Sequence, residues 1–565
     1  DDRNRPCGIV MANRAGRQAI TAKVIIDATE RATVARLAGA RFRPYPDGMH
    51  TFKRVVIGGG VRQGNNLSAR TISPPFMERL PDYAGATNAF YPVIEYTLQL
   101  PVKDDSMASL AAADQQARTL TYHPDQQVTS DVLFEVPPDS MYGQKSQNGE
   151  FRPDGVEGIF VLGGCADVPR QEAEKLLRPR ALIELGERLG TAAAAEAKSL
   201  PAPTGVTAPG KPAQQPAAGG DVHEILVGVR PTQKLPTIPQ TAQAVPVIGQ
   251  YDVVVVGGGT AGAPAGIGAA RQGAKTLVIE CLSGLGGIGT LGSITGYCSG
   301  NRVGFTASVK VPVLPFKRGG KIWAIEQKAE WWRAELLKAG GDIWFGAIGC
   351  GALVENGRIT GVIVATPYGR GVVLAKTVVD ATGNSDIAAA AGAPCIYTDE
   401  TEFGMQGTGL PPRVLGVNLI NTDFTITDET DMADVWHLMV YAKRKYMKDS
   451  VFDLGQLVDT RERQRIVGDF TMTILDQLGN RTYPDTVLQA DGGSFDSHGY
   501  VIDPFLSLYK PDASKMLINV PYRSMLPKTL EGILVAGLGI SAHRDAVPLI
   551  RMQPDIQNGG YVAGV

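Results

Sequence analysis

The residues with the clearest chemical purpose are three glycines and one carboxylate in the second half of the chain. Positions 257–262 read Gly-Gly-Gly-Thr-Ala-Gly and fit the pattern G-x-G-x-x-G. In such a pattern Gly257 permits a tight turn, Gly259 lets the backbone approach a pyrophosphate, and Gly262 lets a helix and a strand pack closely. Glu280 follows at the spacing where a carboxylate accepts hydrogen bonds from a ribose. These residues predict dinucleotide binding, with a plain Gly-rich turn as the alternative.

The elements that must position these residues can be read from the same stretch. Residues 253–256 are four valines, an unbroken β-branched run that is typical of a parallel strand buried on both faces. A helix of small residues is predicted over 263–272, and a second strand over 275–279 leads to the carboxylate. The N-terminus of that helix would attract the negative charge of a pyrophosphate. The order strand, glycines, helix, strand and acid supports the dinucleotide interpretation more strongly than the glycines alone.

Three later stretches add to the first one. They are "GLGGIGTLGSITG" (284–296), "AKTVVDATGNSD" (375–386) and the strand, glycine turn and helix of residues 532–564. Together with the first stretch they resemble the FAD-dependent oxidoreductases of the glutathione-reductase-like superfamily, and within it the broad bacterial FAD-dependent oxidoreductase family. The stretches "DTRERQRIVGDF" (459–470) and "SFDSHGY" (494–500) are similar to two further segments of that family, the second of them in its cap.

The resemblance spans residues 250–565 and implies a fold, a cofactor and an activity. The implied fold is α/β, with a Rossmann-like FAD-binding domain, a β-meander insert and a mixed α+β cap. The implied enzyme is an FAD-dependent oxidoreductase of a family whose substrates are diverse. Our own hypothesis is that it transfers a hydride from a small polar or carbohydrate-like substrate to FAD. Because the loop 284–296 holds no histidine, to which some relatives attach FAD, non-covalent FAD is expected. Cofactor contacts are predicted at Gly257, Gly259, Thr260, Ala261, Gly262, Glu280, Gly287, Thr290, Asp380, Ala381, Thr382, Gly383, Gly537, Ser541 and Arg551.

Four residues are candidates for catalysis, and each also has a plainer structural interpretation. Arg461 and Arg465 are spaced i, i+4, which would place them on one helical face where paired arginines suit an anionic substrate. The alternative is an internal salt bridge that holds the cap to the base. His498 and His543 could take a hydroxyl proton while a hydride leaves, although a loop histidine is often merely solvated. Arg551, just ahead of the C-terminal helix, could stabilise a reduced flavin or form a helix-end ion pair.

Residues 1–200 contain weak copies of stretches from the second half. The stretch 8–42 runs parallel to 361–395, and the stretch 157–167 runs parallel to 531–541. We interpret the first 200 residues as the C-terminal part of a first FAD-oxidoreductase-like unit, in tandem with the second. A self-sufficient domain is the alternative, but it would begin at a mid-sheet hairpin and leave a buried sheet edge unpaired.

The first copy differs from the second in its beginning and in one key residue. Asp380 lies 128 residues after Asp252, where the second unit opens, whereas only 26 residues precede the equivalent Asp27. The front of the first unit is therefore expected to come from an upstream segment or from another polypeptide. Glu30 stands where the second copy has Gly383, which puts a charge where the backbone should approach the cofactor. We interpret the first copy as degenerate and retained for packing.

These comparisons predict the order of domains along the chain. Residues 1–200 are the partial first unit, and residues 201–250 are a linker rich in Pro, Ala and Gly. Residues 251–394 form the FAD-binding domain of the second unit. Residues 395–530 form its cap, where substrate recognition is expected, and residues 531–565 return to the FAD-binding domain.

Composition narrows the function classes. The net charge of −2 and the absence of a basic run give no hint of nucleic acid, so a small-molecule substrate is expected. No stretch is apolar enough for a membrane span, so a soluble protein is expected, and an oligomer is expected as its assembly. The six cysteines are scattered without a C-x-x-C pair, which indicates no metal site. A non-catalytic flavoprotein or structural subunit of a larger assembly remains the alternative function.

Overall fold

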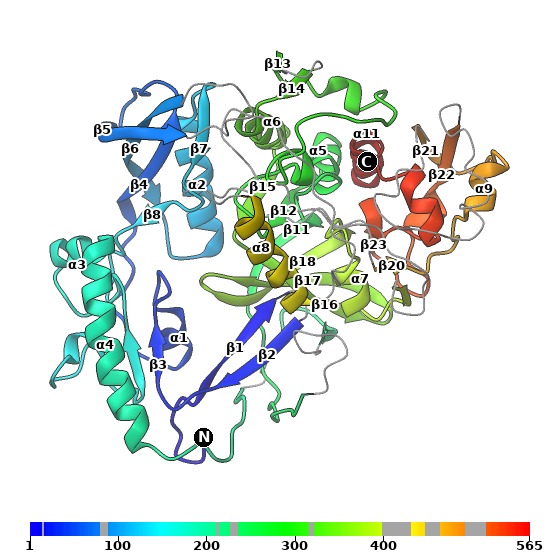
Figure 1. Cartoon of the computed structure of the whole chain (residues 1–565). Coiled ribbons are helices and arrows are strands. Elements are labelled where there is room, and N and C mark those ends of the chain that lie inside the picture. The colour runs from blue at the N-terminus through cyan, green and yellow to red at the C-terminus, as the bar shows by residue number, and fades with distance from the viewer. Residues whose placement is uncertain are drawn as a thin grey trace.

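The computed structural model shows two parts of the chain lying side by side (Figure 1). The N-terminal part is coloured blue to cyan and the part that holds the dinucleotide pattern is coloured green to red. The structure describes residues 1–13, 16–78, 89–210, 214–225, 235–315, 321–397, 431–446, 464–491 and 516–565. Within these ranges, no helix is both long enough and apolar enough to cross a membrane.

A parallel sheet forms the centre of the second unit. Its strands are β11 (Val247–Val256), β12 (Thr276–Glu280), β15 (Asp342–Phe345), β18 (Gly369–Asp380) and β23 (Ile533–Val535). They lie in the order β15, β12, β11, β18 and β23, and each neighbouring pair runs parallel. The four predicted valines end β11, whose last three residues are buried. The predicted parallel strand is therefore confirmed.

Three helices cover one face of this sheet and bring the C-terminus to the phosphate loop. They are α5 (Gly262–Arg271), α6 (Ile325–Lys338) and α11 (Gln553–Gly564), and α5 and α11 lie against each other (Figure 1). A Cβ built on Gly560 of α11 would lie 2.0 Å from the carbonyl oxygen of Ala261. Glycine at this position lets α11 approach the backbone where α5 begins. The C-terminal helix is therefore packed directly behind the G-x-G-x-x-G loop.

An antiparallel meander continues the sheet from β18. Strands β16 (Ile348–Glu355) and β17 (Arg358–Thr366) form a hairpin, and β17 pairs with the first half of β18. The hairpin turns at Asn356 and Gly357, which have φ of 50° and 78°, the positive values that a tight two-residue turn requires. Strand β10 (Asp221–Glu224) pairs with β16 although it lies within the predicted linker. The meander delivers the chain to Asp380, as the sequence predicts.

The region predicted as the cap is mixed where the structure describes it. Its helices and strands there are β19 (Cys395–Ile396), α8 (Met432–Tyr446), β20 (Arg465–Ile466), α9 (Ile474–Leu478), β21 (Thr486–Asp491) and β22 (Leu517–Pro521). Strand β20 pairs with β19 and β21 pairs with β22, both antiparallel. The prediction that Arg465 lies on a helical face is wrong, because this residue lies in β20.

The first unit holds a second sheet and a short parallel strand pair. The five-stranded sheet contains β4 (Gly48–Gly58), β5 (Leu67–Glu78), β6 (Ala89–Val102), β7 (Gln126–Thr129) and β8 (Phe134–Glu135), and helix α2 (Met107–Thr121) packs against it. The other elements are β1 (Gly8–Asn13), β2 (Gly16–Thr21), β3 (Ile25–Asp27), α1 (Thr33–Leu37), β9 (Ile159–Val161), α3 (Arg170–Leu176) and α4 (Pro179–Ser199). Strand β3 pairs in parallel with β9, as β18 pairs with β23.

The tandem repeat is visible in the hydrogen bonds of one turn. Asp27 at the end of β3 accepts hydrogen bonds from the backbone and hydroxyl of Thr29, at 3.0 and 2.6 Å. Asp380 at the end of β18 accepts the same two bonds from Thr382, at 3.1 and 2.7 Å. The other oxygen of each aspartate accepts backbone N–H groups of the helix that follows. The two units therefore share a strand, a turn and a helix start at matching positions.

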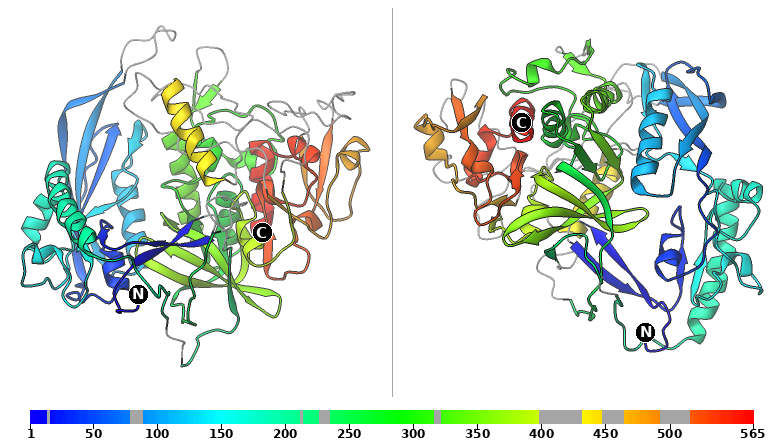
Figure 2. Two further views of the ribbon diagram at one scale, coloured as in Figure 1. Left: turned by 60° about the horizontal axis from the view of Figure 1, so that its bottom comes forward. Right: turned by 180° about the vertical axis from the view of Figure 1, so that it is seen from behind.

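An ion pair joins a strand of the first unit to the sheet of the second, where the same carboxylate also pairs with an arginine of that sheet. Glu224 of β10 pairs with Arg17 of β2 at 3.1 Å and with Arg370 of β18 at 2.7 Å. Figure 2 shows β1 and β2 reaching across to the β16–β18 meander, against which they pack. The charged pair and the packed hairpin fix how the first unit sits against the second.

Candidate functional site

The phosphate loop has the geometry that its glycines predict. Gly257 has φ of +89°, and a Cβ on it would lie 2.5 Å from the carbonyl oxygen of Ala381. A Cβ on Gly262 would lie 1.6 Å from the carbonyl oxygen of Gly257. Gly259 is different, because the nearest atom to a Cβ there is the Cα of Gly287, 3.9 Å away. Two glycines thus make the turn possible, and the third leaves space for a ligand at the N-terminus of α5.

The second Gly-rich loop packs against the first. The N–H of Gly286 donates to the carbonyl oxygen of Gly258 at 2.9 Å. Gly287 has φ of +59°, and a Cβ on it would lie 2.8 Å from the backbone nitrogen of Thr260. The hydroxyl of Thr290 is buried and donates to the carbonyl oxygen of Leu285 at 2.7 Å, so it holds the loop in shape. The structure therefore brings the predicted positions of both loops together.

The turn after β18 lies on the other side of the phosphate loop. Asp380 is buried at its start, and burial raises the pKa of this carboxyl to about 6. Gly383 has φ of +74°, and a Cβ on it would have no atom within 4 Å. Ala381 and Thr382 connect these two residues, and Ala381 contacts Gly257 as described above. The turn thus leaves open space next to the phosphate loop, where a ligand can approach its backbone.

Glu280 lies beneath the same loop. Its Oε2 accepts the N–H of Gly258 at 2.7 Å and its Oε1 accepts the N–H of Leu282 at 2.8 Å. The side chain is buried, and this burial raises its pKa although the hydrogen bonds oppose the shift. Oε1 also accepts the thiol of Cys281 at 3.3 Å, whereas Oε2 has a further lone pair that can accept a ribose hydroxyl. The open glycines, the helix N-terminus and this carboxylate fit the pyrophosphate and ribose of FAD.

The C-terminal segment closes the site from a third direction. Gly537 has φ of +83°, and a Cβ on it would lie 3.2 Å from the Cβ of Ala261 in the phosphate loop. Ser541 is buried, and its hydroxyl is bonded to the N–H of Gly468 at 2.9 Å and to the hydroxyl of Thr471 at 2.8 Å. Ser541 therefore fastens this segment to the cap. Arg551 stands two residues before α11, where the sequence predicts it.

The first turn of α11 contains an acid that sequence reasoning missed. Asp555 is fully buried, and its Oδ1 accepts the N–H of Asn301 at 2.8 Å and that of Asp491 at 3.3 Å. Its Oδ2 has no hydrogen-bond partner among the described residues. Burial raises the pKa of this carboxyl to about 7. An aspartate in the first turn of a helix is common, so only its burial could have marked it.

A buried lysine lies behind the second Gly-rich loop and was also missed. Lys328 of α6 holds its Nζ 3.3 Å from the ring centroid of Trp323 and 4.7 Å from that of Tyr297. Neither this Nζ nor the Oε1 of Gln553 has a hydrogen-bond partner among the described residues. A Cβ on Gly289 would lie 2.4 Å from that Oε1 and 3.0 Å from that Nζ. Burial lowers the pKa of Lys328 well below its usual value, which favours the neutral amine.

The structure describes two of the four predicted catalytic residues, His543 and Arg465. The side chain of His543 is 53% exposed, and its Nδ1 lies 3.4 Å from the carboxylate of Asp545. Arg465 is buried in β20, so it does not share a helical face with Arg461. Arg461 and His498 lie outside the described residues. Within those residues, no group of three His, Cys, Asp or Glu side chains could hold a metal ion.

Comparison with known proteins identifies one matching family. The family model described as FAD dependent oxidoreductase matches residues 252–411 and 408–565, which together are more than half of the chain. Two curated relatives are named tRNA uridine 5-carboxymethylaminomethyl modification enzyme MnmG. The one from Christiangramia forsetii is 29% identical over 30% of this chain and 33% of its own length. The one from Caldicellulosiruptor saccharolyticus is 31% identical over 24% of this chain and 25% of its own length.

Solved structures show a more distant likeness. A geranylgeranyl bacteriochlorophyll reductase-like protein from Thermoplasma acidophilum is 18% identical, covers 55% of this chain and 76% of its own, and has a TM-score of 0.27. Mycobacterium smegmatis Sdh1 in complex with UQ1 is 15% identical, covers 56% of this chain and 68% of its own, and has a TM-score of 0.28. The chain spans about a third or less of the length of the two curated relatives.

Proposed function

Because the chain belongs to the FAD dependent oxidoreductase family and is an FAD-dependent enzyme, we propose that it oxidises a small polar or carbohydrate-like substrate by hydride transfer. The hydride would pass to non-covalently held FAD. Support for the cofactor's place comes from the open space at Gly259 and Gly383, with Glu280 beneath the loop. These residues would hold the pyrophosphate and the adenosine ribose. When bound, FAD supplies the hydride acceptor.

The observation that carries the proposed chemistry is the buried carboxyl of Asp555. Oxidation of an alcohol by hydride transfer releases a proton, and a nearby base must accept it. A base works best when its pKa lies near the working pH, and burial brings the pKa of Asp555 to about 7. Its Oδ2 has no partner among the described residues, so it can accept a hydroxyl proton. His543, with a half-exposed side chain, is the weaker candidate for this role.

The first experiment is a visible spectrum of the purified protein, followed by release and counting of the flavin. One FAD per chain is expected, because only the second unit has an open phosphate loop among the described residues. Anaerobic mixing with sugars, polyols and 2-hydroxy acids should then bleach the flavin with at least one of them. A flavin that stays oxidised with every compound would contradict the proposed substrate class and favour the non-catalytic alternative.

A second candidate substrate comes from the curated relatives, whose name states that they modify uridine in tRNA. Against it stands a net charge of −2 without a basic run, since nucleic-acid binding depends on lysine and arginine contacts to phosphate. Titration with mixed tRNA at low salt separates the two candidates. Saturable binding that weakens steeply with salt would favour the tRNA candidate over the small-molecule proposal.

A further inference from the structure

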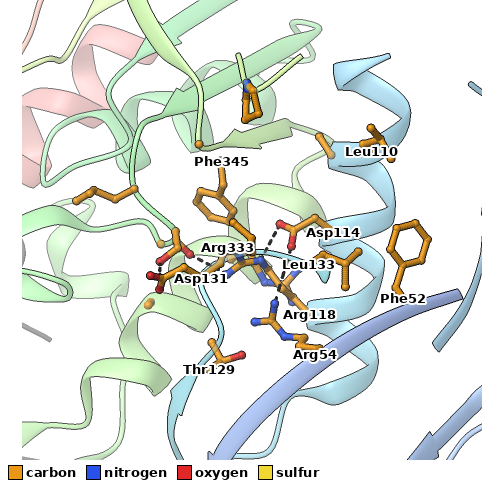
Figure 3. Close-up of a pocket in the computed structure, with 18 of the residues that line it drawn as sticks. Phe52, Arg54, Leu110, Asp114, Arg118, Thr129, Asp131, Leu133, Arg333 and Phe345 are labelled. Atoms are coloured by element: carbon orange, nitrogen blue, oxygen red, sulfur yellow. Dashed lines mark hydrogen bonds and ion pairs between the residues drawn. The ribbon is translucent and has the colours of Figure 1, made fainter. Parts of the chain in front are cut away.

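A cavity of about 390 Å³ lies between the two units and outside the cofactor site described above. The first unit contributes α2, β4 and β7 to its walls, and the second contributes α6, β15 and residues 281–284 (Figure 3). Residues 281–284 directly follow Glu280. The cavity therefore begins beyond the ribose end of the predicted cofactor site.

Two arginines that line this cavity, Arg31 and Arg54, have nitrogens without hydrogen bonds, but Arg31 has a close ion pair with Asp139 at 2.9 Å, whereas the ion pair of Arg54 is longer. Arg54 of β4 is buried, and its Nε and Nη1 have no hydrogen bond among the described residues. Its Nη1 lies 3.8 Å from Oδ1 of Asp114, too far for a hydrogen bond (Figure 3). Burial and the nearby charge of Arg118 lower the pKa of this guanidinium to about 9. A buried cation with unfilled donors is unfavourable, and an anionic ligand would relieve this.

The two arginines beside it already have partners. Arg118 donates from Nε to the carboxylate of Asp114 at 2.7 Å and from Nη1 to the carbonyl oxygen of Ser283 at 2.7 Å. Arg333 donates from Nη2 to Glu330 at 2.6 Å. Figure 3 shows both guanidinium groups gathered next to Arg54. Of these three arginines, Arg54 is the one that keeps donors for a ligand.

The carboxylates around the cavity have other hydrogen-bond partners, although the charges of Asp114 and Glu326 still favour the charged form of Arg54. Glu326 accepts from the amide of Gln126 at 3.2 Å, and Glu135 is bonded to His50 at 2.7 Å. Asp131 accepts from the hydroxyl of Ser283 at 3.1 Å. Burial raises the pKa of Glu30, which favours its neutral form.

The lining of the cavity also includes apolar side chains, which bear on the kind of ligand. Phe52, Leu110 and Leu133 of the first unit and Phe345 of the second lie around the arginines (Figure 3). A cavity of this volume falls within the range of small-molecule sites. An ion without an apolar body would leave these side chains uncovered. The walls therefore suit an organic anion better than inorganic phosphate.

The repeat explains why such a cavity exists here. Glu30 and Arg31 line it, and they occupy the positions of Gly383 and Asn384 in the second unit. In the second unit that turn presents open backbone next to the phosphate loop. In the first unit the same turn presents side chains, and the second unit closes over it. The first unit thus retains a cleft at the equivalent place, with a different lining.

We propose that this cavity binds a small organic oxyanion, a carboxylate or phosphate ester with an apolar body, through the guanidinium of Arg54. The site is separate from the oxidation chemistry and goes beyond the proposed function. Arg54 would bind the oxyanion, and the apolar walls would cover the body of the ligand.

The test uses calorimetric titration of the FAD-loaded protein, in which the cofactor site is filled. Benzoate and phenyl phosphate serve as anionic probes, and benzamide serves as the neutral probe of matched shape. Benzoate or phenyl phosphate should bind with one site per chain, and benzamide should bind at least tenfold more weakly. The variant Arg54→Met should weaken binding of the anion at least tenfold and should raise the thermal midpoint of the ligand-free protein.

The matched control is Arg180→Met, which removes an exposed arginine of the first unit and should change neither readout. Should Arg54→Met fail to fold, Arg54→Lys keeps a cation and should retain anion binding at reduced affinity. The proposal is overturned if neither anion binds, if benzamide binds as well as benzoate, or if Arg54→Met binds benzoate like the parent protein.

Discussion

Replacing Asp555 by asparagine should make the protein more stable above neutral pH while it slows substrate oxidation. The pKa of this carboxyl is about 7 in the folded protein against a usual 3.8. A difference of about 3 units corresponds to about 4 kcal/mol at 1.36 kcal/mol per unit. Between these two values the folded state binds a proton that the unfolded state has released. Stability therefore falls as the pH rises from about 4 to about 7.

Asparagine cannot ionise, so the variant removes this loss. Its side-chain oxygen can still accept the N–H groups of Asn301 and Asp491, and its amide would lie where Oδ2 lacks a partner. Denaturant unfolding should show the variant gaining about 1.5 kcal/mol over the parent protein at pH 5 and up to about 4 kcal/mol at pH 8. Comparing the two proteins cancels other groups that titrate in this range, such as Asp380. Asp125→Asn, with a side chain that is 80% exposed, is the control.

The same variant tests the proposed role in catalysis. In the parent protein the rate of flavin reduction by substrate should rise with pH around 7, as the carboxyl becomes a base. The variant should lose this dependence and most of the rate. If the two proteins lose stability in parallel between pH 5 and pH 8, the carboxyl is not perturbed by burial and the argument for Asp555 as the base fails.

Three further changes test the packing around the site. Gly259→Val should fold with an unchanged thermal midpoint. It should bind FAD at least about tenfold more weakly in a fluorescence titration, because its side chain takes the space left for pyrophosphate. Unaltered affinity for FAD would contradict this placement of the pyrophosphate. Gly560→Val should lower stability by about 3 kcal/mol in urea unfolding, because its Cβ would meet the backbone of Ala261, and a loss below about 1 kcal/mol would refute the close helix contact. Lys328→Met should raise stability by about 1–3 kcal/mol in the same assay, since it removes a buried amine without a partner. Lys338→Met, on the exposed side of the same helix, should change stability little.

The sequence predicted best those parts of the fold that depend on local chemistry. The valine strand, the glycine turn and the helix of small residues each follow from a few neighbouring residues. The meander turn at Asn356 and Gly357 has the same basis, because few residue types adopt its positive φ values. The helix expected around Arg465 failed because i, i+4 spacing alone does not define a helix. There β20 pairs with β19, which lies far away in the sequence.

The residues that the sequence did not mark owe their properties to burial by distant segments. Asp555 becomes a perturbed acid because the loop of Asn301 and the end of β21 at Asp491 cover it. Lys328 lies on an ordinary helix. That its amine lacks a hydrogen bond can be recognised only in the folded structure, where the ring of Trp323 covers it. Neither environment exists within one stretch of sequence, so pattern and spacing could not reveal them.

The two copies of the aspartate turn show how one position decides what a repeat can bind. Asp27 and Asp380 hold their turns with the same hydrogen bonds, so the backbone scaffold does not distinguish the units. The difference comes after the shared threonine. Gly383 leaves open space where backbone can approach a phosphate, whereas Glu30 fills that place with a side chain. A turn that no longer offers its backbone can contribute only side chains to a ligand. In the first unit the donors without hydrogen bonds nearby belong to Arg54 and to Arg31, and Arg31 is held in an ion pair by Asp139 at 2.9 Å. The same scaffold would thus recognise a dinucleotide through backbone in one copy and an organic anion through a guanidinium in the other.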